Sequence, residues 1–574
     1  MLKARSASLS ALLISSLLSA CPSDPVVEND AGGDAPPSDA GSDAGPPPPD
    51  VCEQLGLART PMRASTGTVQ GDVAGDFTVN ELGGTTFHLA DAWTGCESYV
   101  FLTYFPRTSG SGVWEGDALF GSLGAAGIDE GPRNVQYFFM SNEEDEAART
   151  TRVETLAWDF DDALQALPDE EERNFWRSRM HYVTDRATEI EGAPGAYLRD
   201  YIAYSRTPEA VVDLGDRGRA GAPIPFAFAI DRDQRFDPGD SLAPSVGTRS
   251  NFSMVRFLPD YFNYLHDLDV RLAGETVTVV PVLADERTTA RIIEREVTLP
   301  SATAMAAFDT LEFDVAITCD ERNPFACSEW DRIAKISLCT EATCDEETHE
   351  LVRWITPYWR RGTQHWTIDA SALLGMLREG GTQTLRVELG PAWERATEWT
   401  THVAMRFSTR DAPRAMGAIP AFRGGNFDAT YNDAHAPMQF TVPVGATRVE
   451  LVTILSGHEQ ISGNNCAEWC DHRHIFSVGT TALPALQHTM PAIFSDLGCA
   501  AHARDGVIPG QLGNWAQTRA YWCPGLPVEA TRTDITSLVT PGTETTLSYA
   551  GNYRGGMPVG GNIELSSYVV WYAP

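Results

Sequence analysis

Two short segments of the chain place a carboxylate beside an indole within a cysteine-flanked stretch. They are Cys327–Arg332, which contains Asp331, and Cys466–Cys470, which contains Glu468. Partial desolvation by an indole raises the pKa of a carboxyl group and lets it exchange protons near neutral pH. Hydrolysis of an amide needs such a group, because water must be activated and the nitrogen leaving group must be protonated. Asp331 and Glu468 are therefore the candidate acid-base residues.

Cationic and aromatic residues are candidates for holding a substrate. Arg332 is predicted to bind carbonyl or sugar oxygens and to tune Asp331, and Arg519 to hydrogen-bond a carboxylate or a developing oxyanion. Aromatic faces are platforms for sugars, so Trp330 and Tyr358 are assigned to the cleft, although most tryptophans of a β-sandwich fill its core. The alternative for Asp331 is a structural aspartate paired with Arg332.

Composition limits the class of protein. A chain of 574 residues is too long for one core and predicts about three or four domains. The formal net charge of −35 repels phosphate backbones, so no nucleic-acid partner is expected.

The N-terminus has the features of an export signal. Lys3 and Arg5 precede an apolar run, and residues 18–21 end in Cys21 like the lipobox of bacterial lipoproteins, whose cysteine is acylated. A secreted protein with a chance cysteine is the alternative. Residues 22–50 are rich in Pro, Asp, Gly and Ala and predict a disordered acidic linker. We expect an exported envelope lipoprotein that meets the membrane through its N-terminal lipid alone.

Ten cysteines are left after Cys21, and an even number in an exported chain predicts disulfides. The rival interpretation is a zinc site, but the cysteines do not form the paired Cys-x-x-Cys array that such a site needs. The spacing suggests the pairs Cys52–Cys96, Cys319–Cys327, Cys339–Cys344, Cys466–Cys470 and Cys499–Cys523.

Residues 52–272 are predicted to form an α/β domain. Strands are expected within 77–90, at 99–105 and at 135–140, followed by a long helical stretch over about 143–186. The order of elements, with Pro225 before the apolar run 226–230, resembles the thioredoxin fold. A thioredoxin-type oxidoreductase needs Cys-x-x-Cys after its first central strand, but residues 105–110 contain no sulfur. The resemblance therefore implies a redox-inactive domain.

The remainder predicts two all-β sandwiches. The first covers 285–415 with strands at 297–300, 310–318, 333–339, 349–355, 382–389 and 401–408. The second covers 420–574 with strands at 438–442, 448–454, 475–478, 546–549 and 566–572, and the join is placed near 416–425. The fold class is multidomain, with an α/β domain followed by two jelly rolls.

Residues of about 285–570 resemble the peptide-N-glycosidase F family of secreted bacterial amidases. The resemblance rests on the segments 327–332, 355–359, 466–470 and 514–525. It implies that Asp331 is the primary catalytic residue, that Glu468 assists from across an interdomain cleft, and that Arg332 belongs to the centre. It further implies family equivalents of three of the cysteine pairs, no metal or organic cofactor, and a monomer acting on N-glycosylated glycoproteins or glycopeptides. Substrate-binding positions carried over are Trp330, Ile355, Tyr358, Trp393, Arg519 and Trp522.

Two departures from the family pattern concern sugar recognition. The family's Glu-x-Trp element corresponds to Glu388–Trp393, where no acid stands two residues before Trp393. The family's Ser-Gly-Trp-Gly-His is shortened to Ser456–His458, which lacks the aromatic residue. The implied catalytic centre is retained while the sugar-binding rim is altered.

Two alternatives come from other functional classes. His472 and His474 alternate on a predicted strand and would place two imidazoles on one face, as in a copper-dependent monooxygenase of the related tandem jelly-roll fold. A non-catalytic glycan-binding lipoprotein is the second alternative, and release of free glycan would separate it from an enzyme.

Overall fold

The computed structural model describes residues 50–106, 131–205, 227–240, 255–319, 328, 330–341, 344–345, 347–358, 360, 362–391, 398–459, 466–490, 497–511 and 514–573. The predicted signal segment, Cys21 and the acidic linker lie outside these residues. Residues 50–574 form one compact unit.

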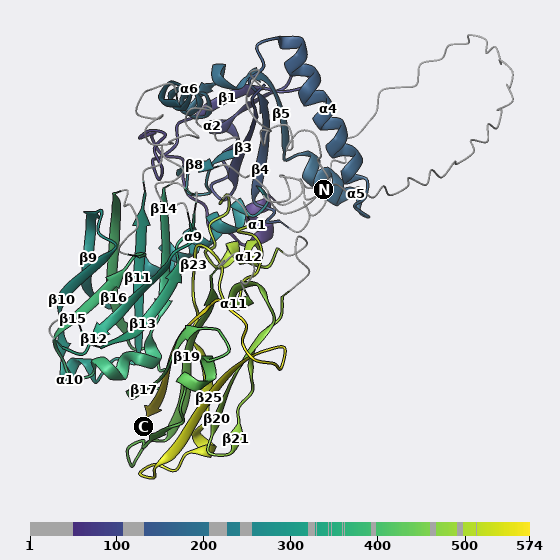
Figure 1. Ribbon diagram of the computed structural model, residues 1–574. Helices are drawn as coiled ribbons and strands as arrows, with labels where there is room; N and C mark the ends of the chain where they lie inside the picture. The colour runs from purple at the N-terminus through teal and green to yellow at the C-terminus, as the bar shows by residue number, and fades with distance from the viewer. Residues whose placement is uncertain are drawn as a thin grey trace, which may run out of the picture. The chain divides into compact units, whose positions relative to one another are not determined.

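The N-terminal part contains a five-stranded sheet of order β5-β4-β3-β7-β8 (Figure 1). Its central strands are β3 (Ser98–Tyr104) and β4 (Val135–Ser141), which pair in parallel and are almost entirely buried. β7 (Ala227–Ile230) and β8 (Phe236–Asp240) add an antiparallel hairpin. A small sheet of order β2-β1-β6 comprises β1 (Phe77–Asn80), β2 (Thr86–His88) and β6 (Glu191–Gly192).

The predicted helix over 143–186 is wrong in its last part. α4 (Glu146–Leu164) and α5 (Glu170–Arg177) are helices, but Met180–Arg186 is strand β5, which pairs in parallel with β4. A parallel pair needs a crossover connection, and α4 and α5 supply it. The other helices here are α1 (Val51–Leu55), α2 (Leu89–Ala92), α6 (Ala193–Ser205) and α9 (Leu258–Gly274).

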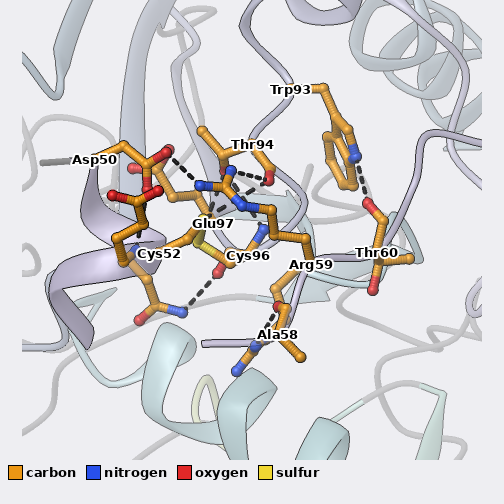
Figure 2. Close-up of a disulfide and its surroundings, with 12 residues drawn as sticks. Asp50, Cys52, Ala58, Arg59, Thr60, Trp93, Thr94, Cys96 and Glu97 are labelled. Carbon is orange, nitrogen blue, oxygen red and sulfur yellow. Dashed lines mark hydrogen bonds and ion pairs between the residues drawn. A yellow bond between two sulfur atoms is a disulfide. The ribbon is translucent and has the colours of Figure 1, made fainter. Parts of the chain in front are cut away.

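A disulfide fastens the start of this part to its central sheet. Cys52 in α1 is bonded to Cys96, which lies just before β3 (Figure 2). Arg59 bridges the same region, because its guanidinium pairs with Asp50 and donates to the Thr94 carbonyl at 3.0 Å (Figure 2). The 105–110 segment, predicted to replace a redox motif, is described only at Phe105 and Pro106.

The first β-sandwich has eight main strands in two antiparallel sheets, of order β10-β15-β12-β13 and β14-β11-β16-β9. Their inner faces enclose one hydrophobic core that includes Phe313, Trp354, Trp366 and Trp399. The predicted boundary at 285 falls inside β9, and β14 was not predicted. The strands are β9 (Thr278–Thr288), β10 (Ile292–Ser301), β11 (Thr310–Thr318), β12 (Ile333–Cys339), β13 (Thr348–Ile355), β14 (Thr363–Asp369), β15 (Gly380–Glu388) and β16 (Trp399–Ser408).

The second sandwich repeats this arrangement with sheets of order β17-β26-β19-β24 and β18-β25-β20-β21, where β22 also pairs with β20. The segment 416–425, predicted as a join, lies within strand β17, which pairs with β26. The strands are β17 (Ala415–Asn426), β18 (Met438–Phe440), β19 (Arg448–His458), β20 (His472–Val478), β21 (Thr481–Ala482), β22 (Leu486–His488), β24 (Thr531–Asp534), β25 (Thr545–Tyr553) and β26 (Asn562–Tyr572).

Both sandwiches are jelly rolls. Numbered from the first strand of each sandwich, with β21 and β22 counted together as one strand, the sheets run 1-8-3-6 and 2-7-4-5 in both cases. Nested Greek-key connections produce this order, in which the first strand lies beside the last. The predicted pair of jelly rolls is therefore observed for the described residues.

The two sandwiches share a buried polar network. Arg353 of β13, with no exposed surface, donates to both carboxylate oxygens of Glu350 at 2.7 Å and to Ser456 of β19 at 2.7 Å. It also donates to the Glu564 carbonyl of β26 at 2.8 Å, while Ser566 donates to Glu350 at 2.6 Å. β23 (Leu526–Pro527) from the second half of the chain extends the first sandwich's sheet beside β13. Backbone and side chains thus both join the sandwiches.

The N-terminal part is also continuous with the second sandwich's long connection, residues 498–525. One hydrophobic cluster contains Tyr137, Phe160 and Trp176 together with Cys499, Trp515 and Cys523. Arg360, fully buried, pairs with Asp237 of β8 at 3.1 Å and donates to the Pro509 carbonyl at 3.1 Å. The N-terminal part therefore packs against the 498–525 connection.

Four of the five predicted disulfides are formed between described residues: Cys52–Cys96, Cys339–Cys344, Cys466–Cys470 and Cys499–Cys523. Cys319 is also disulfide-bonded, and its predicted partner Cys327 lies outside the described residues. Within the described part of the chain, no helix combines the length and apolar character needed to cross a membrane.

Candidate active site

Asp331 is held at the entrance to β12 by the backbone on either side of it. Arg332 and Thr356 clamp the segment: the Arg332 amide donates to Thr356 Oγ1 at 2.9 Å, and the Thr356 amide donates to the Arg332 carbonyl at 2.8 Å. This clamp continues the β12–β13 ladder, in which Ile333 is opposite Ile355. Asp331 keeps 22% of its side-chain surface exposed, so it can meet a substrate.

Glu468 is positioned by α11 (Cys466–Trp469), a single helical turn closed by the Cys466–Cys470 disulfide. The turn is held on both sides, because the Ala467 amide donates to Gly560 at 3.0 Å and the Ala520 amide donates to the Glu468 carbonyl at 3.3 Å. The Glu468 side chain is only 7% exposed. A short, cross-linked turn therefore presents an almost fully buried carboxylate.

Arg519 lies between the two carboxylates and is 1% exposed. Its Nη2 is 3.7 Å from Asp331 Oδ2, and its Nε donates to Glu468 Oε1 at 3.3 Å. Tyr521 adopts a left-handed φ of 67°, and the resulting turn pairs Arg519 with Trp522 across an antiparallel bridge. The structure thus brings together the three predicted residues Asp331, Glu468 and Arg519, one from the first sandwich and two from the second.

Burial controls the protonation of both acids. It raises the pKa of Glu468 to about 7, with the guanidinium of Arg519 opposing the rise and the charge of Asp331 adding to it. Burial also raises the pKa of Asp331, against the lowering effect of Arg519 and, more weakly, of Arg332. Near neutral pH the buried Glu468 therefore holds its proton more readily than an ordinary glutamate.

The raised pKa of Glu468 predicts a pH dependence of stability. The free energy of unfolding should fall as the pH rises from 4.5, the ordinary value, to about 7, because the unfolded chain loses this proton while the folded protein keeps it. Above about pH 7 Glu468 is ionised in both the folded and the unfolded protein, so its contribution to the free energy of unfolding no longer changes with pH. In Glu468→Gln this decline should be missing, which urea unfolding of both proteins over a pH series would measure. Asp231, whose pKa burial raises to about 7, affects both proteins equally. If the free energies of unfolding of the wild-type protein and Glu468→Gln fell equally between these pH values, the raised pKa of Glu468 would be contradicted.

Two site residues were missed as functional candidates. Asn514 Oδ1 accepts from the Tyr358 hydroxyl at 3.2 Å and from Arg519 Nη2 at 2.8 Å, and Gln511 Oε1 accepts from the Tyr358 amide at 3.2 Å. Burial raises the pKa of Tyr358 to about 12, so its hydroxyl keeps the proton it donates. The polar residues spaced around Arg519 in the 511–519 segment were the signal that could have found them.

The predicted sugar contacts fall into three groups. Trp330 exposes 54% of its surface and is free to meet a ligand. Tyr358, Ile355 and Trp522 are buried, at 8%, 1% and 5% exposure; Ile355 and Trp522 share a small core cluster between the sandwiches. Trp522 Nε1 donates to the Gly457 carbonyl at 2.7 Å. Trp393 lies outside the described residues.

His472 and His474, the predicted copper pair, are fully buried and belong to one hydrogen-bond chain. His472 Nε2 donates to the Ala467 carbonyl at 2.9 Å, its Nδ1 faces His474 Nε2 at 3.0 Å, and His474 Nδ1 accepts from Tyr549 at 2.6 Å. All four ring nitrogens thus have protein partners, and burial lowers both imidazole pKa values. The described residues contain no group of three or more His, Cys, Asp or Glu placed to hold a metal ion. A metal ligand role would require these hydrogen bonds to break.

Comparison with known proteins gives a consistent set of similarities. Residues 426–570 match the family model for peptide-N-glycosidase F, C terminal. A curated relative, the peptide-N(4)-(N-acetyl-beta-D-glucosaminyl)asparagine amidase F of Elizabethkingia miricola, is 28% identical over 264 residues, which cover 42% of this chain and 69% of the relative. The solved structure of PNGase F, a glycosylasparaginase from Flavobacterium meningosepticum, is 21% identical with a TM-score of 0.39, covering 52% of this chain and 96% of that one. The structure of PNGF-II is 11% identical with a TM-score of 0.40, covering 54% of this chain and 67% of that one.

Proposed function

The chain is a peptide-N-glycosidase F-like protein, and from that premise we propose that it hydrolyses the amide bond between an N-linked glycan and asparagine. The products are a glycosylamine and a peptide in which aspartate replaces asparagine. The observation that carries the proposal is the placement of Asp331 and Glu468 on the shared guanidinium of Arg519.

In this mechanism Asp331 is the acid-base residue. It is the more exposed of the two acids, so its carboxylate takes a proton from water while the water oxygen attacks the amide carbonyl carbon. The same proton then passes to the departing nitrogen as the carbon–nitrogen bond breaks. Glu468, which burial keeps protonated up to about pH 7, orients the water and the sugar. Arg332 neighbours the centre and favours the ionised form of Asp331.

Substrate recognition is the part of the proposal in which this chain departs from the family pattern. Trp330, which is 54% exposed and precedes Asp331 in the chain, is the sugar platform we propose. The hydroxyl of Tyr358 supports the site through its hydrogen bond to Asn514 Oδ1. N-glycosylated glycoproteins or glycopeptides are the proposed substrates, with a core preference altered by the shortened 456–458 motif and the displaced acid before Trp393.

Isotope labelling tests the reaction directly. Residues 51–574 incubated with a defined N-glycopeptide in oxygen-labelled water should release the intact glycan and leave a labelled aspartate at the former glycosylation site. Mass spectrometry reads both products, and an Asp331→Asn protein serves as the control. Cleavage between sugars, or bound but uncleaved glycopeptide, would contradict the amidase and support in turn a glycosidase or a glycan-binding protein.

Two further features belong to the proposal. We propose that Cys21 is acylated and tethers the folded body to the cell envelope through residues 22–50, an arrangement that suits a protein with four observed disulfides. We also propose that the mixed sheet of the N-terminal part is a redox-inactive thioredoxin-like domain.

A further inference from the structure

Arg519 is largely engaged by acceptors of the protein. A guanidinium carries five N–H groups, and Arg519 makes four hydrogen bonds with them and forms a longer ion pair with Asp331. Nε faces Glu468 at 3.3 Å, and Nη1 faces the carbonyls of Asn514 and Gln517 at 3.3 and 3.1 Å. Nη2 faces Asn514 Oδ1 at 2.8 Å and Asp331 Oδ2 at 3.7 Å. Arg519 therefore organises the site and, as predicted, hydrogen-bonds a carboxylate, that of Glu468, so that few of its N–H groups are left to act as a donor to an oxyanion.

Amide hydrolysis still needs such a donor, because attack on the carbonyl carbon places negative charge on its oxygen. The hydroxyl of Tyr358 already donates its one proton to Asn514. The indole N–H of Trp469 has no partner among the described residues, but the atom is closed off from solvent. Neither group can reach a carbonyl oxygen without a rearrangement.

Asn514 has the donor that these groups lack. Its carboxamide can face Arg519 in one way only, because a guanidinium donates and never accepts, so Oδ1 must point at Nη2. The Nδ2 group then points away from Arg519. It has no hydrogen-bond partner among the described residues, and Asn514 is a partly exposed residue. Two N–H bonds are thus held in a fixed orientation at a residue whose Oδ1 shares Arg519 Nη2 with Asp331.

We propose that Asn514 Nδ2 donates a hydrogen bond to the carbonyl oxygen of the scissile amide as that oxygen becomes an oxyanion. This inference rests on the proposed amidase function. Water oxygen forms the new bond to carbon, Asp331 takes the water proton, and the carbonyl π pair moves to the oxygen facing Nδ2. When the carbonyl re-forms, the carbon–nitrogen bond breaks and Asp331 returns the proton to the amine. Asn514 is unchanged throughout.

Two substitutions separate the donor role of Asn514 Nδ2 from the role of Oδ1 as an acceptor for Arg519 and Tyr358. Asn514→Asp keeps an oxygen for both Arg519 and Tyr358 but removes the N–H bonds, whereas Asn514→Ala removes both functions. We expect both variants to lose about 10² to 10³ in kcat at every pH with little change in KM, the loss typical of one oxyanion donor. Glycopeptide release is measured over a pH series, with circular dichroism to check folding. Asn514→Asp retains the internal contacts and is decisive if Asn514→Ala does not fold.

The possible results discriminate clearly. Near-normal turnover by Asn514→Asp beside a defective Asn514→Ala would overturn the proposal, since Oδ1 alone would then matter. Recovery of Asn514→Asp at another pH would also overturn it, because the added charge would have shifted the acids instead. A raised KM with unchanged kcat would assign Nδ2 to a sugar acetamido carbonyl and not to the oxyanion. A wild-type protein that releases no glycan contradicts the proposed function itself.

Discussion

Asp331→Asn should keep the fold and lose glycan release by about 10² to 10⁴ in kcat. The amide is nearly isosteric with the carboxylate and still offers an oxygen to Arg519, 3.7 Å away, but it cannot take a proton from water. Because burial raises the pKa of Asp331, replacing it with a neutral group removes a desolvation cost and should not destabilise the protein. Steady-state kinetics on an N-glycopeptide would measure the loss in kcat, and urea unfolding of the variant and the wild-type protein would measure their stability.

Asp345→Asn is the matched control for this substitution. Asp345 lies in the same sandwich and is exposed, so its amidation should leave turnover unchanged. Glu468→Gln should be damaging, but less so than Asp331→Asn, because Glu468 orients groups and does not exchange the proton. Turnover by Asp331→Asn close to that of the control would remove Asp331 from the mechanism.

Arg353→Met should destabilise the protein by about 3 to 5 kcal/mol, the cost of leaving one member of a buried ion pair without its partner. Glu350 is 6% exposed and would lose both 2.7 Å bonds to the guanidinium. The bonds from Arg353 to Ser456 and Glu564 would also be lost, so the contact between the sandwiches should loosen. Urea unfolding followed by tryptophan fluorescence would measure the loss.

Two further variants make the Arg353 result specific. Adding Glu350→Gln should recover most of the stability, because the uncompensated charge is then removed. Arg423→Met breaks a second ion pair between the sandwiches, with Glu347 at 3.1 Å, but both side chains are more than half exposed and the loss should stay below about 1 kcal/mol. Equal losses for the two arginines would show that burial does not decide the strength of this interface.

The sequence by itself was informative where the determining signal is local. β11 and β12 begin and end at the predicted residues, because alternating apolar side chains mark a half-buried strand whatever its partner is. Short cysteine spacings predicted the Cys339–Cys344 and Cys466–Cys470 bonds, since closure of so short a loop leaves few alternatives. The motifs around Asp331, Glu468 and Arg519 selected residues that are far apart in the chain and adjacent in the fold.

Other features were decided only by tertiary structure, because they depend on partners distant in the sequence. Met180–Arg186 is a strand because β4 offers it a parallel edge, and Ala415–Asn426 is a strand because β26 pairs with it. The motif containing Ile355 does not say that this side chain faces the core between two sandwiches. The alternation of His472 and His474 does not reveal that both rings are already engaged.

The role of Arg519 is the clearest case of this division. Its place in a motif identified it as a site residue, but whether its N–H groups are free depends on which acceptors surround it. Folding brings five acceptor atoms from four residues around one guanidinium and turns the N–H groups of the Asn514 amide away from it. Residue types determined which groups the site contains, whereas the three-dimensional pairing of donors with acceptors determined which of them are left for a substrate.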